Sequence, residues 1–187
     1  MSEQAEKIKK STSESMKRSL EHLERELIKI RAGKASPSMV EGIMVEYYGS
    51  PTPINQVANI TVSDARTLTL QPWEKPMIAE IEKAIQAANI GVNPQNDGEI
   101  IRLFLPPLTE ERRKDLVKQA YAEGEQGKIS IRNVRRDGIN SIKSLEKEGL
   151  SEDQVKFYEQ KIQELTDSYI EKIDNLCKAK EKDIMTI

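Results

Sequence analysis

The sequence predicts an α+β protein in which a small α/β domain is inserted after the first helix of a long three-helix bundle. Residues 2–30, and again the residues that follow 108, place apolar side chains at three- and four-residue steps with charges between them. That spacing is the period of an amphipathic helix. Residues 38–105 instead show short alternating runs and turns, and all eight prolines fall between Pro37 and Pro107. Two helical regions therefore flank one module of a different pattern.

The apolar stripes of the three predicted helices need one another. A helix of about 29 residues is about 44 Å long and cannot bury its stripe alone. We therefore assign residues 1–30 and 106–187 to one discontinuous bundle and residues 31–105 to the inserted domain. Two connectors, near 31–37 and 104–108, are rich in Gly, Ser and Pro. They are expected to act either as a hinge or as a rigid bend.

The first predicted helix covers residues 2–30 and contains no proline or glycine. The segment from Gly33 to Pro37 ends it, because a residue before proline avoids the helical region. Its stripe is formed by Ile8, Thr12, Met16, Leu20 or Ser19, Leu23, Leu27 and Ile30.

The middle segment predicts strands, turns and one short helix. Strand-like runs lie at residues 43–48, 57–62, 67–71 and 100–105. Residues 49–53 and 96–98 are expected as turns, since both are built of turn-forming residues. A helix is expected from Pro76, a favourable first-turn residue, to about Ala88.

Two further helices of about 35 residues each follow the module. Thr109 is the expected N-cap of the first, and the segment at Gly149 ends it. Ser151 and Gln154 form a capping box for the second, with a hydrophobic staple from Leu150 to Val155. Gly124, Gly127 and Gly138 lie inside the first of these helices, where each costs about 1 kcal/mol relative to alanine. Close helix approach explains them best, and a kink is the second interpretation.

Composition excludes several classes of function. No apolar run approaches the ~20 residues of a membrane span, and the N-terminus lacks the apolar core of a signal peptide. Cys177 is the only cysteine and His22 the only histidine. They exclude a disulfide framework, and make multi-histidine metal sites and most hydrolytic triads untenable. We therefore expect a cytoplasmic binding protein, not an enzyme, with no cofactor and no metal.

A basic ridge is the most specific binding signal. Residues 128–136 hold four bases and no acid, in a chain whose net charge is −2. Helical geometry places five bases within an arc of about 100°, namely Lys128, Arg132, Arg135, Arg136 and Lys143. Guanidinium groups bind phosphate bidentately and stack on bases, which favours recognition of folded RNA. The alternative is a solvated face with intrahelical ion pairs, although acids are scarce at four-residue steps around this segment.

The whole sequence resembles the bacterial ribosome recycling factor family. The resemblance is carried by four segments, Lys29–Pro37, Val45–Pro53, Leu105–Leu116 and Arg132–Asp137. It implies an L-shaped, two-domain protein that binds the large ribosomal subunit after termination of translation. It also implies that elongation factor G, with GTP, drives the inserted domain and splits the ribosome into subunits, releasing mRNA and tRNA.

The resemblance assigns roles to particular residues. Family arginines that contact ribosomal RNA correspond to Arg132, Arg135 and Arg136, with Lys128 beside them on the same ridge. A second basic motif corresponds to Arg31 and Lys34, where the family usually has arginine at the second position. Gly138 stands where alanine is more common. The expected hinge consists of Ala32, Gly33, Leu105, Pro106 and Pro107.

Two other hypotheses for the function are compatible with the sequence. The long stripes suit a helical adaptor or holdase that docks partner helices, and an unrecognised hydrolase would require measurable turnover. Tyr48 and Trp73 are candidates for contacting the GTPase, and the alternative for each is a place in the core. A monomer is favoured because the three helices of one chain can bury one another's apolar stripes.

Overall fold

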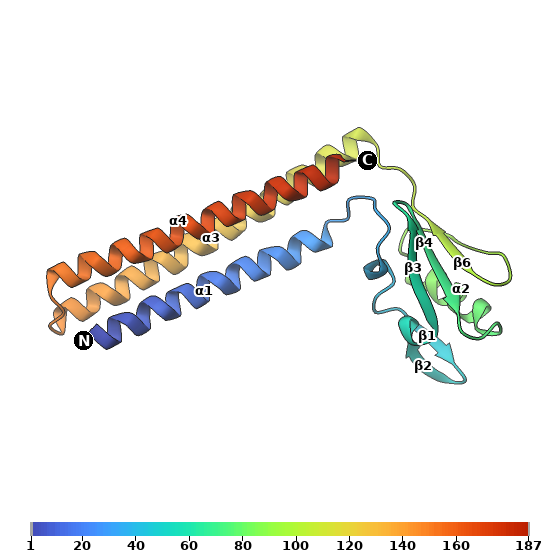
Figure 1. The fold of residues 1–187 in the computed structure, drawn as a ribbon, viewed down its shortest axis with the longest axis horizontal. Helices are drawn as coiled ribbons and strands as arrows, with labels where there is room; N and C mark the ends of the chain where they lie inside the picture. The colour runs from blue at the N-terminus through green and yellow to red at the C-terminus, as the bar shows by residue number, and fades with distance from the viewer. Residues whose placement is uncertain (1, 187) are drawn as a thin grey trace. The chain divides into compact units, whose positions relative to one another are not determined.

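The computed structural model describes residues 2–186, which form two compact units. One unit combines the residues up to Ala32 with those from Glu110 onward, and the other is Gly33–Thr109. The first contains three long helices, α1 (Ser2–Lys29), α3 (Glu110–Lys147) and α4 (Glu152–Met185) (Figure 1). The predicted α+β class, a helical bundle interrupted by a small α/β domain, is confirmed.

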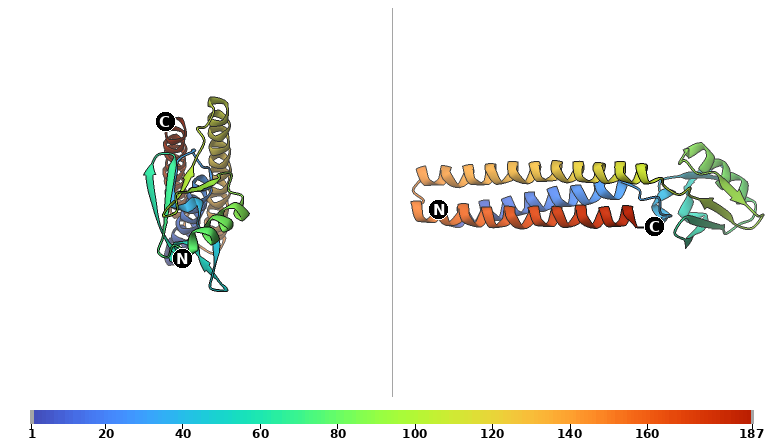
Figure 2. Two further views of the ribbon diagram at one scale, coloured as in Figure 1. Left: turned by 90° about the vertical axis from the view of Figure 1, so that its right-hand side faces the viewer. Right: turned by 90° about the horizontal axis from the view of Figure 1, so that it is seen from above.

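Each helix of the bundle packs against both others, as Figure 2 shows from two sides. The predicted stripes form its core, where full burial of a large aliphatic side chain contributes about 1.5–3 kcal/mol. Core residues with almost no exposed surface are Met16, Leu23, Ile131, Ile142, Ile162 and Ile173. Ile8 and Leu20 of the predicted α1 stripe are only partly buried. None of the helices in residues 2–186 has both the length and the apolar character needed to cross a membrane.

The turn between α3 and α4 follows its sequence signals. Ser151 is the N-cap of α4, and its hydroxyl accepts a hydrogen bond from the Gln154 N–H at 3.4 Å. Leu150 and Val155 are buried in the same cluster, beside Tyr158 and Ile142. The N-cap and the staple are confirmed, but the full capping box is not, because Oε1 of Gln154 accepts from the Ser151 hydroxyl at 3.4 Å and not from its backbone N–H.

The glycines inside α3 mark the closest helix approaches. A Cβ on Gly124 would overlap Sγ of Cys177, and one on Gly138 would lie 2.6 Å from Oγ1 of Thr12. At Gly127 the added atom would press on Leu23 at 3.3 Å. Close packing is therefore confirmed as the reason for these residues.

The inserted unit contains a two-stranded hairpin, a four-stranded antiparallel sheet and one α-helix. The hairpin joins β1 (Met44–Tyr47) to β2 (Ser50–Pro53). In spatial order the sheet is β3 (Ala58–Asp64), β4 (Thr67–Pro72), β6 (Ile101–Phe104) and β5 (Pro94–Asn96). The helix α2 (Met77–Ala88) contacts β1 and β5, and it shares one core with Leu68, Leu70 and Leu103. Two short 3₁₀ turns, Pro37–Met39 and Ile54–Gln56, complete the unit.

Both expected turns are shorter than predicted. Residues 50–53 form strand β2, because proline, which has no N–H to donate, is tolerated in a strand that pairs on one side only. The turn itself is only Tyr48 and Gly49. Asn96 belongs to the edge strand β5, which pairs with β6 and is too short to show alternation.

Candidate nucleic-acid interface

The arginine ridge lies on α3, midway along the longest helix. Arg132 and Arg136 are exposed and Arg135 is half-buried against α4. The helix surface between them is a shallow hollow of about 370 Å³, lined by Arg132, Asn133, Arg135, Arg136, Ile139 and Asn140. Because α3 is packed against two other helices, the spacing of these guanidinium groups is held by a rigid support.

The hydrogen-bond partners of the arginines are neutral. Nη1 of Arg135 donates to Oε1 of Gln163 on α4 at 2.9 Å. Nη2 of Arg136 donates to Oδ1 of Asn133 at 3.0 Å, one turn earlier on α3. Within residues 2–186, neither of these guanidinium groups, nor that of Arg132, forms a salt bridge. Their positive charge is therefore available to an outside anion.

The two lysines of the ridge are different. Nζ of Lys128 lies 2.7 Å from Oδ1 of Asp174 on α4 and 3.4 Å from Oε1 of Glu125, and its side chain is only 18% exposed. The hydrogen bond from Lys128 to Asp174 raises the pKa of its ammonium group. Nζ of Lys143 lies 3.3 Å from Oε1 of Glu159. Acids are scarce at four-residue steps, as expected, but the inference that the ridge has few acidic partners is wrong for both lysines.

The reason for that error is physical. Steps of four residues along α3 do not include Glu125, which is three residues from Lys128, and they cannot include acids supplied by α4. Contact of Lys128 with RNA stays a prediction.

The second basic motif spans the boundary between the two units. Arg31 is exposed just after α1 ends, whereas Lys34 is half-buried at the start of the inserted unit. Nζ of Lys29, in the same segment, lies 2.7 Å from Oε1 of Glu26. RNA contact by Arg31 and Lys34 stays a prediction.

Both connectors are tied to adjacent residues of the β3–β4 turn. The Ala35 N–H donates to the Ala65 carbonyl oxygen at 2.8 Å, and the Leu105 N–H donates to that of Arg66 at the same distance. These two bonds anchor the chain where it enters and leaves the inserted unit. Leu105, one of the expected hinge residues, is thus held by its backbone to the inserted unit.

The connectors also meet at Gly33. Its φ of +73° lies in the left-handed region, and a Cβ there would lie 2.7 Å from Cγ of Leu108. Only glycine combines that backbone with that neighbour. The role of Ala32, Gly33, Leu105, Pro106 and Pro107 as a hinge stays a prediction.

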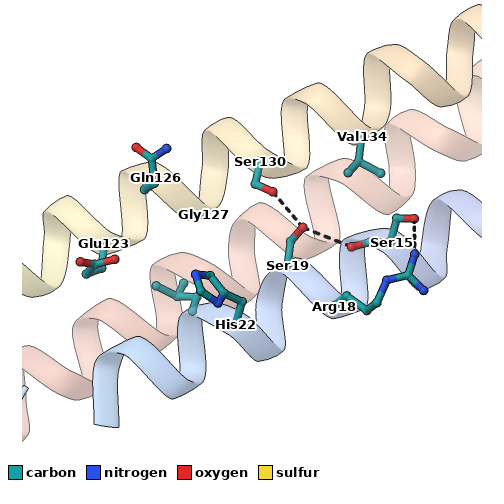
Figure 3. A pocket seen from close by; sticks show the side chains of 10 residues that line it. Ser15, Arg18, Ser19, His22, Glu123, Gln126, Gly127, Ser130 and Val134 are labelled. Atoms are coloured by element: carbon teal, nitrogen blue, oxygen red, sulfur yellow. Dashed lines mark hydrogen bonds between the residues drawn. The ribbon is translucent and has the colours of Figure 1, made fainter. Parts of the chain in front are cut away.

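A groove of about 520 Å³ between α1 and α3 holds the only histidine (Figure 3). Ser19 and Ser130 share a hydrogen bond of 2.9 Å across it, and Ser19 donates to the Ser15 carbonyl oxygen at 3.2 Å. His22 is exposed and forms no hydrogen bond with another residue in the described part of the chain. The serine hydroxyls thus join helices and are not paired with a base.

Cys177 is buried, and desolvation raises the pKa of its thiol. In residues 2–186, no three His, Cys, Asp or Glu side chains are grouped so that they could hold a metal ion.

Sequence reasoning did not identify three polar residues that complete the ridge. Gln163 on α4 orients Arg135, and its own Nε2 donates to Asp167 at 2.8 Å. Asn133 and Asn140 line the hollow between the arginines. The asparagines share the outer face of α3 and were detectable from helical periodicity, whereas the contribution of Gln163 depends on the packing of two helices.

Comparison with known proteins gives one consistent result. Residues 23–185 match the family model described as ribosome recycling factor. The chain is 58% identical to the ribosome-recycling factor of Flavobacterium johnsoniae and 56% identical to that of Flavobacterium psychrophilum, with 100% of both chains covered in each case.

Solved structures agree with the sequence relatives. A solution structure of the ribosome recycling factor is 41% identical, with a TM-score of 0.76 and 98% of both chains covered. The second similar structure comes from models of the T. thermophilus ribosome recycling factor and the E. coli elongation factor G bound to the E. coli post-termination complex. It is 43% identical, with a TM-score of 0.62, and the match covers 97% of this chain and 99% of that one. The chain therefore belongs to the ribosome recycling factor family.

Proposed function

We propose that this protein binds the large ribosomal subunit after translation termination, with the α3 arginines on ribosomal RNA. Together with elongation factor G and GTP it then splits the post-termination complex into subunits and releases mRNA and tRNA. The observation that carries the proposal is the trio of Arg132, Arg135 and Arg136, whose guanidinium groups have no acidic partner within residues 2–186. A similar chain occurs in models that contain elongation factor G and a post-termination complex, which supports the same partners here.

Family membership defines the class of the protein. It is a translation factor concerned with ribosome recycling, and it is not an enzyme. The GTP hydrolysis in the proposed reaction belongs to the partner. We also propose that the protein acts as a monomer in the cytoplasm.

The proposed mechanism is mechanical. The arginines anchor a stiff bundle to RNA, since a rigid array of guanidinium groups binds phosphates without further ordering of the backbone. The inserted unit is joined to the bundle by two connectors and receives force from elongation factor G. The bundle then acts as a lever that disrupts contacts between the subunits.

The test is light scattering of post-termination ribosomes mixed with this protein, elongation factor G and GTP. We expect a fall in scattering that requires all three components and is strongly slowed by Arg135→Ala. Lys143→Ala is the matched control, because Lys143 lies on the same ridge but is already paired with Glu159. An absence of any fall with folded protein and a matched elongation factor would contradict recycling and favour a helical adaptor.

A further inference from the structure

The inserted unit exposes an aromatic cluster around one carboxylate. The Tyr47 and Tyr48 hydroxyls donate to Oε1 and Oε2 of Glu74 at 2.9 and 2.8 Å. The two rings meet edge to face, with centroids 4.7 Å apart. Tyr48 is 76% exposed, and Trp73, the neighbour of Glu74 in the chain, is 61% exposed. Aromatic side chains this open to water on a small domain favour contact with a partner.

Tyr48 occupies a backbone position that suits it poorly. It forms with Gly49 the two-residue turn between β1 and β2, a hairpin that lies beside the four-stranded sheet (Figure 1). The φ values are +47° at Tyr48 and +84° at Gly49, the combination for which Asn-Gly is preferred. A bulky residue with positive φ is strained, and burial of the ring does not compensate, because most of the ring is in water. Burial therefore does not explain the tyrosine at this position.

The charge of the cluster indicates what it binds. Residues 33–109 carry eight acids and five bases, a net charge of −3. Lys75, the base next to Glu74 in the chain, lies 3.6 Å from Glu99 instead. Glu74 forms no salt bridge within the described part of the chain. An uncompensated carboxylate in an acidic domain repels phosphate and attracts a cation.

We propose that Tyr47, Tyr48 and Glu74 form a binding site for an arginine or lysine side chain on a basic surface of a protein partner. Each carboxylate oxygen accepts one tyrosine hydroxyl and keeps acceptor capacity for an N–H donor. The open face of the Tyr48 ring attracts the same cation through its quadrupole. The two hydrogen bonds hold rings and carboxylate in fixed relation before the partner arrives. The site is separate from the α3 arginines. The proposal rests on the proposed function in one respect only, namely that the partner is met in the post-termination complex.

A binding test on the full-length protein needs no ribosome. Arginine amide and citrulline amide, both acetylated at the α-amino group so that only the charge of the side chain differs, are titrated while the tyrosine ring resonances are followed by NMR. Arginine amide should shift the Tyr47 and Tyr48 signals with millimolar affinity, and citrulline amide should not. Glu74→Gln should weaken the affinity about fivefold, the loss expected for one exposed charged contact. Glu46 is a second exposed acid of the inserted unit and lies on β1, so Glu46→Gln should leave the affinity unchanged. Equal shifts with both ligands, or equal effects of both variants, would overturn the proposal.

A second test separates a binding role from a structural one. Tyr48→Asn relieves the strain in the turn and should raise the melting temperature of the inserted unit by about 4 °C, followed by the fluorescence of Trp73. The same variant should slow ribosome splitting at least fivefold while binding to isolated large subunits stays unchanged. A lower melting temperature would assign Tyr48 a structural role. An unchanged splitting rate would show that the Tyr48 side chain is not used in splitting. Either result would overturn the proposal.

The nature of the partner is tested by a photo-crosslinking amino acid at position 48 in post-termination complexes with elongation factor G. A crosslink to a protein segment that contains arginine or lysine supports the site, and a crosslink to ribosomal RNA overturns it. If the wild-type protein does not split ribosomes, the proposed function fails, while the arginine amide titration still decides the present proposal.

Discussion

Gly124 of α3 lies directly against Cys177 of α4, so that a Cβ on the glycine would overlap the thiol sulfur. Gly124→Ala should therefore lower the free energy of unfolding. Overpacking costs about 1–3 kcal/mol and the gain in helix propensity offsets about 1 kcal/mol, so we expect a net loss of up to about 2 kcal/mol. Chemical denaturation followed by circular dichroism measures it.

The double variant Gly124→Ala/Cys177→Ala provides the control for this prediction. Removing the sulfur leaves the new Cβ at 3.9 Å from Cβ of residue 177, an ordinary contact. The double variant should be more stable than the sum of the single effects predicts, by about 1 kcal/mol or more. Strictly additive effects would mean that the thiol is not what keeps alanine out of position 124.

Binding to the large subunit should depend on Arg132 and Arg135 more than on Lys143. Alanine at either arginine should weaken binding and reduce the slope of log K against log salt by about one, the loss of one phosphate contact. Lys143→Ala should change the slope less, because Glu159 already lies 3.3 Å from its ammonium group. Equal losses at all three positions would argue for bulk charge attraction and against a specific anchor.

Lys128→Gln separates a structural role from RNA binding on the same ridge. The side chain pairs with Asp174 across the α3–α4 interface and is mostly buried. We expect its loss to lower the free energy of unfolding by up to about 1 kcal/mol, with a smaller change in salt slope than Arg132→Ala produces. An unchanged free energy of unfolding, together with a decrease of about one in the slope of log K against log salt, would contradict this. Lys128 would then bind phosphate and not serve mainly to join the helices.

The inserted unit should lose part of its stability in acid through Asp97. Backbone N–H groups of Glu99 and Ile100 donate to Oδ1 of Asp97, Nη1 of Arg102 donates to Oδ2 at 2.9 Å, and together they lower the pKa of Asp97 to about 2. A carboxyl whose folded pKa is depressed stabilises the fold fully above its unfolded pKa of about 4. That contribution is lost as the pH falls from about 4 toward 2.

Asp97→Asn tests this pH dependence. The wild-type protein should be more stable than the variant at pH 7, and the difference should shrink between pH 4 and pH 2. Urea titrations followed by the fluorescence of Trp73, the only tryptophan, report on the unit concerned. Glu41→Gln, an exposed neutralisation in the same unit, is the control. A constant difference across that range would mean that the Asp97 charge does not stabilise the turn.

Gly33→Ala should impair ribosome splitting more than it impairs binding to the large subunit. It combines left-handed strain of about 1–2 kcal/mol with a clash at Leu108, where the two connectors meet. Gly42→Ala is the matched control, since Gly42 has a φ of +82° but open space where the Cβ would lie. Both variants should melt earlier, measured by Trp73 fluorescence, and only Gly33→Ala should slow splitting. Equal slowing would show that strain in the unit, not the connector, limits the reaction.

Much of the fold was predictable because helical periodicity and capping are local properties. The stripes of the three long helices, the N-cap at Ser151 and the helix near residues 77–88 depend only on neighbours within a few positions in the chain. The short strands β2 and β5 were not predictable, because three or four residues that contain proline show no alternation. They become strands only because β1 and β6 lie beside them.

The same division applies to the candidate sites. Residue type and helical angle are enough to place Arg132, Arg135 and Arg136 on one face of α3. Which bases keep an uncompensated charge depends on helix packing, because α4 brings Asp174 to Lys128 and the neutral Gln163 to Arg135. The tertiary structure also brings Glu74 to Tyr48, 26 residues apart in the chain. Electrostatic and hydrogen-bonded pairs act over a few ångströms in space, and distance along the chain does not reveal them.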